Sequence, residues 1–407
     1  MRALVPLYFA LIACLPGLAA SLAGVHLSPQ TTALVAGAAI LGASFLLLWA
    51  CDVAQHDIPQ ALALAVVALI AVLPEYAVDM YFTWMAGQHP DSDYAHFAIA
   101  NMTGANRLLI GVAWTAVAGI VWWRTRKPVV LESERRLEVV FLGLATAYAI
   151  TIPLSGSLTW VDGAVLVGLY VAYIALAGRR EAEEPDLEGV AARIARLPAV
   201  KRRWVTALLF LFAAGVIVAN AERFSEGLVA TGRILGVSEF LLVQWLAPIA
   251  SEAPEFIVAI MFALRGRAGL ALGSLVSSKL NQWTLLVGMI PGVYGVSSGS
   301  FATPIPLDGL QLHEILLTAA QSLLAVGLLA GLRLDVRGAL LLFGLFIGQF
   351  LAPAVPNAVW ALLPGHLTGG QVHYLFTFLY LGTFVVLLPR IGPQLLVLVR
   401  PGHRGTS

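Results

Sequence analysis

The sequence predicts an all-α membrane protein of about twelve transmembrane helices, arranged as two inverted five-helix repeats with one extra helix at each end. Three observations lead to this fold class. The 407 residues are 59% hydrophobic and only 12% charged, a composition typical of polytopic membrane proteins. Apolar stretches of the length that crosses a bilayer, about 20 residues, recur along the whole chain. Two Pro-Glu pairs, Pro74-Glu75 and Pro254-Glu255, interrupt such stretches about half the chain apart.

Twelve apolar segments are long enough to be counted as transmembrane helices. They are 3–23, 31–53, 58–87, 95–123, 137–154, 160–178, 204–233, 237–265, 268–293, 310–331, 336–353 and 372–398. The first segment follows Arg2 and ends in small residues, so it is compatible with a retained helix and with a cleaved signal peptide. The remaining topology is the same in both cases.

The distribution of basic residues predicts the orientation of these helices. With the N-terminus inside, 20 of the 24 Lys and Arg residues fall in cytoplasmic segments. The outer loops contain none; they are 24–30, 88–94, 294–309 and 354–371. This positive-inside pattern predicts cytoplasmic termini, and the short loops favour a bacterial inner membrane.

The domain organisation follows from one polar linker. We expect an N-terminal helix, a first repeat, a charged cytoplasmic linker interpreted as a solvated connector, a second repeat, and a C-terminal helix with a tail. Their boundaries are 1–30, 31–178, 179–203, 204–353 and 354–407. A net charge of +1 gives no sign of nucleic-acid binding. The two cysteines, Cys14 and Cys51, have no disulfide or metal-site spacing.

Two segments align as an internal repeat. A-I-A-N-M-T-G-A-N-R-L-L-I-G (98–111) follows the first Pro-Glu pair, and A-L-G-S-L-V-S-S-K-L-N-Q-W-T (271–284) follows the second. The alignment pairs Leu109 with Gln282. Because five helices per repeat is an odd number, the second repeat is predicted to insert in the opposite orientation.

These motifs resemble those of the cation/Ca²⁺ antiporters, which include the sodium/calcium exchangers. That family carries G-T-S-L-P-E on one helix and A-L-G-N/S-x-x-G-S-N-x-x-N/D on the next. This chain keeps L-P-E (73–75), the N-x-x-G-x-N frame (101–106), P-E (254–255) and A-L-G-S-x-x-S-S (271–278). The resemblance covers roughly residues 31–353. It implies a secondary antiporter that exchanges Ca²⁺ for Na⁺ or H⁺ at a midplane carboxylate site, without a cofactor and without enzymatic activity.

The chain also departs from the family motifs. The hydroxyls of G-T-S are absent from the first repeat (70–72) and half kept in the second, where Glu252 follows Ser251. The terminal Asn/Asp is Leu109 in one repeat and Gln282 in the other. These departures leave the coupled ion and the stoichiometry open.

Intramembrane carboxylates form the centre of the predicted cation site, because charge in an apolar segment is costly and usually functional. Glu75 and Asp79 are spaced i, i+4, and Glu252 and Glu255 i, i+3, so each pair shares a helical face. Hard cations prefer such oxygen ligands. The full predicted ligand set is Glu75, Asp79, Asn101, Asn106, Ser251, Glu252, Glu255, Ser274, Ser278 and Gln282.

The prolines are expected to add backbone ligands. Pro74 and Pro254 cannot donate to the carbonyls of Ile70 and Ala250. We therefore expect a locally unwound helix at both positions, with these carbonyls exposed to the cation.

Two bases inside the motifs, Arg107 and Lys279, are predicted to compensate charge. Four carboxylates and two bases leave a charge of about −2, which suits one divalent ion or two protons. A buried carboxylate can take a proton when no cation is present, so competition between cation and proton is a simple coupling mechanism. The Lys279 ammonium could also occupy a cation subsite; Lys279→Ala should then change the coupling stoichiometry.

Other interpretations stay open. Glu75 and Glu255 could be structural ion-pair partners of the two bases, and Asp79 and Glu252 could merely neutralise a base. His313-Glu314 is interpreted as an interfacial pair, and His366 and His373 as surface residues. The G-x-S-x-G match at 295–299 has no preceding strand and is not expected to be catalytic.

The competing functions are a monovalent Na⁺/H⁺ exchanger on the same scaffold and a non-transporting, degenerate membrane subunit. An intramembrane enzyme would need a nucleophile pair, a metal triad or a diphosphate site, and the sequence contains none in recognisable form. The expected partners are the transported cations, their counter-ions and the lipid bilayer, while the oligomeric state is not predicted.

Overall fold

The structure is a computed structural model that describes residues 4–55, 57, 72–178, 187–352, 355, 357–360 and 369–399. Nearly all of these residues are helical. The chain divides into two compact units. Unit 1 comprises residues 1–105, 158–256 and 284–305, and unit 2 comprises residues 106–157, 257–283 and 306–407. Both predicted repeats contribute helices to each unit.

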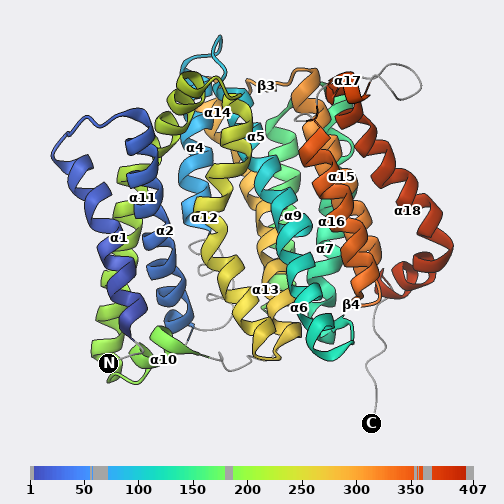
Figure 1. Ribbon diagram of the computed structural model, residues 1–407, viewed down its shortest axis with the longest axis horizontal. Coiled ribbons are helices and arrows are strands. Elements are labelled where there is room, and N and C mark those ends of the chain that lie inside the picture. The colour runs from blue at the N-terminus through green and yellow to red at the C-terminus, as the bar shows by residue number, and fades with distance from the viewer. Residues whose placement is uncertain are drawn as a thin grey trace. The chain divides into compact units, whose positions relative to one another are not determined.

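Unit 1 is a bundle in which α1, α2 and α11 lie side by side (Figure 1). Its elements are α1 (Val5–Leu22), α2 (Pro29–Ala54), α4 (Leu73–Gln88), the start of α5 (Tyr94–Leu108), α9 (Trp160–Ala177), α10 (Gly189–Ala195), α11 (Ala199–Leu235), most of α12 (Glu239–Leu264) and α14 (Val287–Ser297). Ser28 caps α2, because its side chain accepts from the Thr31 amide and Pro29 begins the first turn.

One apolar core in unit 1 holds five helices together. Buried residues of α2, α4, α5, α11 and α12 form it, among them Ile40, Phe82, Phe97, Phe224 and Val243. Between transmembrane helices, close packing of such side chains supplies van der Waals attraction. The core therefore fixes α4, α5 and α12, which carry most of the predicted cation ligands, against one another.

Unit 2 contains the rest of α5 and the helices that follow it. Its elements are η2 (Leu109–Trp114), α6 (Thr115–Thr125), η3 (Ser133–Arg135), α7 (Arg136–Ala149), α8 (Ile152–Ser155), α13 (Ala268–Asn281), the start of η4 (Gln282–Leu286), α15 (Gly309–Leu329), α16 (Val336–Leu351), α17 (Asn357–Trp360) and α18 (Gly369–Val399). Asp308 begins α15 with a capping box that includes Gln311.

Among the described residues, four two-residue strands connect helices at their ends. Strand β1 (Val129–Val130) pairs antiparallel with β4 (Arg333–Leu334), with Val129 opposite Leu334. A second two-stranded sheet joins β2 (Ser157–Leu158) and β3 (Ile305–Pro306). Both sheets are short and join loops, so the described protein is essentially all-α, as predicted.

Two π-helical turns occur at matched positions of the two halves. The turn η2 begins at Leu109, and the turn η4 begins at Gln282. These are the residues that the sequence alignment places opposite each other. A π-helical turn carries one extra residue per turn and is common at functional sites. The matched turns agree with a duplicated structure, while the inverted orientation of the repeats stays a prediction.

Nine helices of the described residues are long and apolar enough to cross a membrane. The other three of the twelve expected segments are also helical where they are described. They are α4, the interrupted helix α13–η4–α14, and the shorter α16. Residues 58–71, which begin the expected helix 58–87 and include Ile70, lie outside the described residues. The count of twelve therefore stays a prediction.

The prolines behave differently from one another. Pro74 lies in the first turn of α4, where a missing N–H costs nothing. Pro254 lies inside α12, which is helical without interruption from Glu239 to Leu264. The predicted unwinding at Pro254 is therefore wrong. The helix continues through Pro254 although this residue cannot donate a backbone hydrogen bond. The Ala250 carbonyl still lacks a donor from residue 254, since proline has no N–H.

Candidate functional site

The acidic face of α4 is buried in unit 1. Glu75 is 3% exposed and Asp79 is fully buried. Asn101 of α5 donates from Nδ2 to Asp79 Oδ1 at 3.1 Å. The other oxygen of Asp79, Oδ2, has no hydrogen-bond partner within the described parts of the chain. The arrangement leaves one carboxylate oxygen in a low-dielectric site available for a cation or a proton.

The second acidic group lies on α12, also in unit 1. Glu252 is fully buried and Ser251 nearly so, whereas Glu255 is half-buried. The Ser251 hydroxyl donates to the carbonyls of Ala247 (3.2 Å) and Pro248 (3.3 Å) of its own helix. Because the hydroxyl proton points back along the helix, the oxygen lone pairs stay available as acceptors.

A glycine contact brings α5 against α12 within unit 1. A Cβ atom on Gly104 would lie 1.8 Å from the backbone oxygen of Gln244. The two helix backbones therefore touch at this level, and only glycine permits it. Gly104 lies three residues after Asn101 and so on the same side of α5. The motif glycine of the first repeat thus packs on the helix that carries Glu252 and Glu255.

The remaining predicted ligands belong to unit 2. Asn106, Ser278 and Gln282 are buried, but Ser274 is exposed and donates to the Ala271 carbonyl of its own helix. Lys279 donates from Nζ to Asn106 Oδ1 at 2.7 Å and lies 4.4 Å from the centre of the Trp283 ring. The structure thus brings together the base of one motif and the amide of the other, two positions that the repeat alignment pairs.

Arg107 has a partner that the sequence interpretation missed. It is fully buried in unit 2 and forms an ion pair with Glu314 of α15. The carboxylate of Glu314 also contacts His373 of α18, Oε1 to Nε2, at 2.9 Å. The charge count of four carboxylates omitted Glu314 and therefore needs correction. Its signal in the sequence was present: a Glu and two His residues inside apolar segments.

One histidine interpretation is wrong. His373, expected at the surface, is 9% exposed. His313 is 7% exposed, and its position at the membrane interface stays a prediction. His366 lies outside the described residues. The apolar faces of α15 and α18 pack together and enclose both rings.

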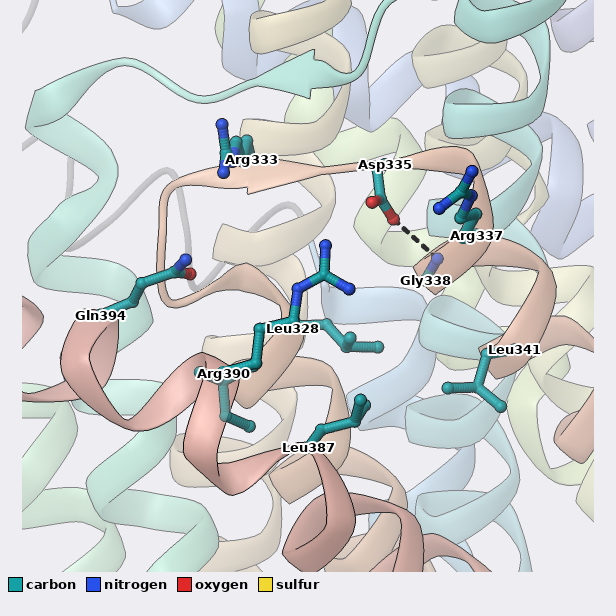
Figure 2. Close-up of a pocket in the computed structure, with 10 residues that line it drawn as sticks. Leu328, Arg333, Asp335, Arg337, Gly338, Leu341, Leu387, Arg390 and Gln394 are labelled. Atoms are coloured by element: carbon teal, nitrogen blue, oxygen red, sulfur yellow. Dashed lines mark hydrogen bonds between the residues drawn. The ribbon is translucent and has the colours of Figure 1, made fainter.

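A pocket in unit 2 is unsuited to cations (Figure 2). Its volume is about 170 Å³, and Arg333, Arg337 and Arg390 are among the residues that line it. Asp335 is the one acid of this lining, and its Oδ1 already accepts from the Gly338 amide at 2.7 Å. Three guanidinium groups would repel a metal cation.

Comparisons with known proteins identify the family. The family model described as sodium/calcium exchanger protein matches residues 29–178 and again residues 205–353. A candidate antiporter of Alkalimonas amylolytica, CaxA, is 23% identical over 245 residues, which is 58% of this chain and 72% of the relative. An uncharacterized membrane protein of Methanocaldococcus jannaschii is 23% identical over 255 residues, covering 62% and 74% of the two chains.

Solved structures of exchangers are similar to this chain as well. The crystal structure of the H⁺/Ca²⁺ exchanger CAX matches with a TM-score of 0.88 and 43% identity, covering 98% of this chain and 97% of that one. The sodium-calcium exchanger NCX_Mj shares the fold, with a TM-score of 0.51 and 18% identity over 78% of this chain and 95% of that one. The resemblance seen in the motifs is confirmed. The protein is an integral membrane secondary transporter, not an enzyme, and needs no cofactor. The chain belongs to the sodium/calcium exchanger protein family.

Proposed function

We propose that this protein is an antiporter that moves Ca²⁺ across the membrane in exchange for H⁺. The observation that carries the proposal is the match to an H⁺/Ca²⁺ exchanger, at 43% identity over nearly the whole length of both chains. The sodium-calcium exchanger shares the fold at a much lower identity, 18%. We infer that the counter-ion is the proton.

The ligand chemistry supports the proton as the counter-ion. In the first repeat the two hydroxyls of the family motif are replaced by Ala71 and Val72. Neutral hydroxyl oxygens help to hold a monovalent ion such as Na⁺, whereas a carboxylate can bind either Ca²⁺ or a proton. A site with fewer hydroxyls and more carboxylates therefore loses Na⁺ ligands and keeps proton acceptors.

In the proposed mechanism Glu75 and Glu255 are the central ligands, and each binds either the cation or a proton. The other proposed ligands are Asp79, Asn101, Asn106, Ser251, Glu252, Ser274, Ser278 and Gln282, with Arg107 and Lys279 as compensating bases. When Ca²⁺ leaves, protonation of the carboxylates removes the repulsion between buried charges. The site then returns across the membrane loaded with protons, so that neither direction carries an empty, fully charged site.

The test is transport in inverted membrane vesicles that are made from cells lacking their own Ca²⁺ antiporters. Uptake of radioactive Ca²⁺ and the internal pH are followed together for wild type, Glu75→Gln and Glu255→Gln. We expect a pH gradient to drive Ca²⁺ uptake in the wild type, and uptake to fall to background in both variants. Glu132→Gln is the matched control, because it removes an exposed carboxylate from a loop.

Three other results would contradict this proposal. A Na⁺-driven pH change without Ca²⁺ flux would indicate a monovalent Na⁺/H⁺ exchanger. Ca²⁺ uptake that follows a Na⁺ gradient and ignores the pH gradient would contradict the proton as counter-ion. Absence of any flux with correctly folded protein would favour a non-transporting subunit.

A further inference from the structure

A buried group of ionisable side chains, His313, Glu314 and His373, lies on α15 and α18 in unit 2. A ring nitrogen of His313, a carboxylate oxygen of Glu314 and a ring nitrogen of His373 lie within 4.8 Å of one another. All three residues belong to unit 2 and are at least nine-tenths buried. The residue types are those of a three-ligand zinc site with two histidines and one glutamate.

The hydrogen bonds of His373 require explanation. Nδ1 lies 3.1 Å from the backbone carbonyl of Gln349, and Nε2 lies 2.9 Å from Oε1 of Glu314. A carbonyl only accepts, so Nδ1 carries the proton. In a neutral ring Nε2 is then a lone pair. It faces an oxygen of a carboxylate that is held ionised by its ion pair with Arg107. Two acceptors at this distance repel, unless a proton or a metal ion lies between them.

His313 favours the metal ion over the proton. Its Nε2 has no hydrogen-bond partner among the residues that the structure describes, although the side chain is buried. A proton between His373 and Glu314 would leave this nitrogen unused. A metal ion bound by both imidazoles would give His313 a partner and remove the cost of a buried, unsatisfied polar atom.

The surrounding contacts match those of a metal site. Histidine ligands usually donate their other ring N–H to a backbone carbonyl or carboxylate, as His373 does to Gln349. Arg107 pairs with Oε2 of Glu314, and Oε1 is the oxygen that faces His373. Ligands of a tetrahedral zinc ion lie roughly 3.3 Å apart, given metal–ligand distances of about 2.0–2.2 Å. The Nε2–Oε1 pair therefore needs to open by only a few tenths of an ångström.

We propose that His313, Glu314 and His373 bind a transition-metal ion, with Zn²⁺ the best fit, and that water completes the coordination. Two imidazole ligands select Zn²⁺ and similar ions over Ca²⁺, which takes six to eight oxygens. The ion fastens α18 to α15 within unit 2. None of the three residues is a proposed Ca²⁺ ligand, and the proposal does not depend on the transport function.

Zinc content tests the site directly. The full-length protein, purified without a polyhistidine tag, is stripped with a chelator, loaded with Zn²⁺ alone and freed of excess metal. We expect about one Zn²⁺ per chain in the wild type and an at least tenfold lower content in His313→Gln and His373→Gln. His89→Gln is the matched control, because it removes one exposed imidazole from unit 1. Glu75→Gln shows whether the retained zinc lies at the transport carboxylates instead.

A second measurement needs no variant and so does not depend on how the variants fold. X-ray absorption of the zinc-loaded wild type should show two imidazole nitrogens and oxygen ligands. Zinc should also raise the thermal unfolding temperature of the wild type and not that of His373→Gln. A wild type that retains no zinc, or a spectrum without imidazole ligands, would overturn the proposal and leave a doubly protonated His373 as the bridge. Zinc that is lost only in Glu75→Gln would overturn it too.

Discussion

Asp79 combines complete burial with one satisfied and one unsatisfied carboxylate oxygen in the described part of the chain. Such a group is costly unless it receives a cation or a proton. Asp79 accepts a hydrogen bond from the neutral amide of Asn101, which weakens the interpretation that it merely neutralises a base. The residue therefore belongs among the proposed ligands rather than among the structural ion pairs.

Asp79→Asn tests this role at nearly constant volume. An amide removes one negative charge and one proton-accepting oxygen while it can still pair with Asn101. We expect the apparent Ca²⁺ affinity to fall on the order of tenfold, with little change in the thermal unfolding temperature. The measurement is Ca²⁺ uptake by vesicles as a function of Ca²⁺ concentration. An unchanged affinity in a folded variant would mean that Asp79 is structural.

The sequence predicted some of these residues and missed others for a physical reason. Glu75, Asp79, Glu252 and Glu255 are detectable because charge is rare in apolar segments. Glu314 is detectable by the same criterion, but its pairing with Arg107 is not, since the two residues are 207 apart in the chain. Pairing depends on which helical faces meet, and a single sequence does not contain that information. His373 was misplaced for the same reason, because α18 has few polar residues to mark its buried face.

At the scale of elements, the contact between α5 and α12 depends on one missing methyl group. A Cβ on Gly104 would lie 1.8 Å from the Gln244 oxygen and 2.8 Å from its carbonyl carbon. Both are backbone atoms inside a helix, so they cannot move aside as a flexible side chain would. The helices must separate or shift instead.

Gly104→Ala should therefore destabilise the protein and impair transport together. Overpacking costs typically 1–3 kcal/mol, and here the displaced atoms are backbone, so we expect a clearly lower unfolding temperature and a several-fold lower rate of Ca²⁺ uptake. Gly119→Ala is the matched control, because a Cβ there meets nothing within 4 Å. If both variants behaved like the wild type, the close approach of α5 and α12 would be contradicted.

An ion-pair cluster links the turn that follows α2 to the start of α11. Arg202 donates to both oxygens of Asp57, at 2.7 Å each, and Arg203 donates to one of them at 3.1 Å. These hydrogen bonds, with the charges of both guanidinium groups, lower the pKa of Asp57 to about 2. A carboxyl whose pKa is lower in the folded state stabilises that state above its unfolded pKa, about 3.9, and the effect is lost as the pH falls towards 2.

Asp57→Asn should consequently lower the unfolding temperature at pH 7 by an amount equivalent to about 1 kcal/mol. The difference from the wild type should shrink below about pH 4 and be lost as the pH falls through about 2. Thermal unfolding followed by tryptophan fluorescence across this pH range measures it. A difference that is independent of pH would show that packing, and not ionisation of Asp57, accounts for the effect.

The elements themselves were well predicted by apolar length and composition, but their irregularities were not. The alignment paired Leu109 with Gln282, but the residue types around them do not indicate that a π-helical turn begins at each position. The uninterrupted path of α12 past Pro254 was also missed. Proline removes one hydrogen bond, and whether the helix then breaks depends on the packing around it.

For the whole molecule, the open question is whether the two repeats are inverted. The family model matches each half separately, and each half carries one π-helical turn at the paired position. A duplicated unit with an odd number of helices must insert in opposite orientations. The asymmetry of Lys and Arg in the loops predicts the same result, because basic loops stay in the cytoplasm.

Reporter fusions decide this topology. A periplasmic reporter, alkaline phosphatase, should be active when fused within 88–94 or 294–309, the expected outer loops. A cytoplasmic reporter, green fluorescent protein, should be fluorescent when fused within 124–136, within 265–268 or after the C-terminus. The informative pair is 88–94 and 265–268, because each follows the Pro-Glu helix of its own repeat. Reporters that place these two loops on opposite sides support inverted repeats. Placement on the same side would contradict the inversion of the repeats.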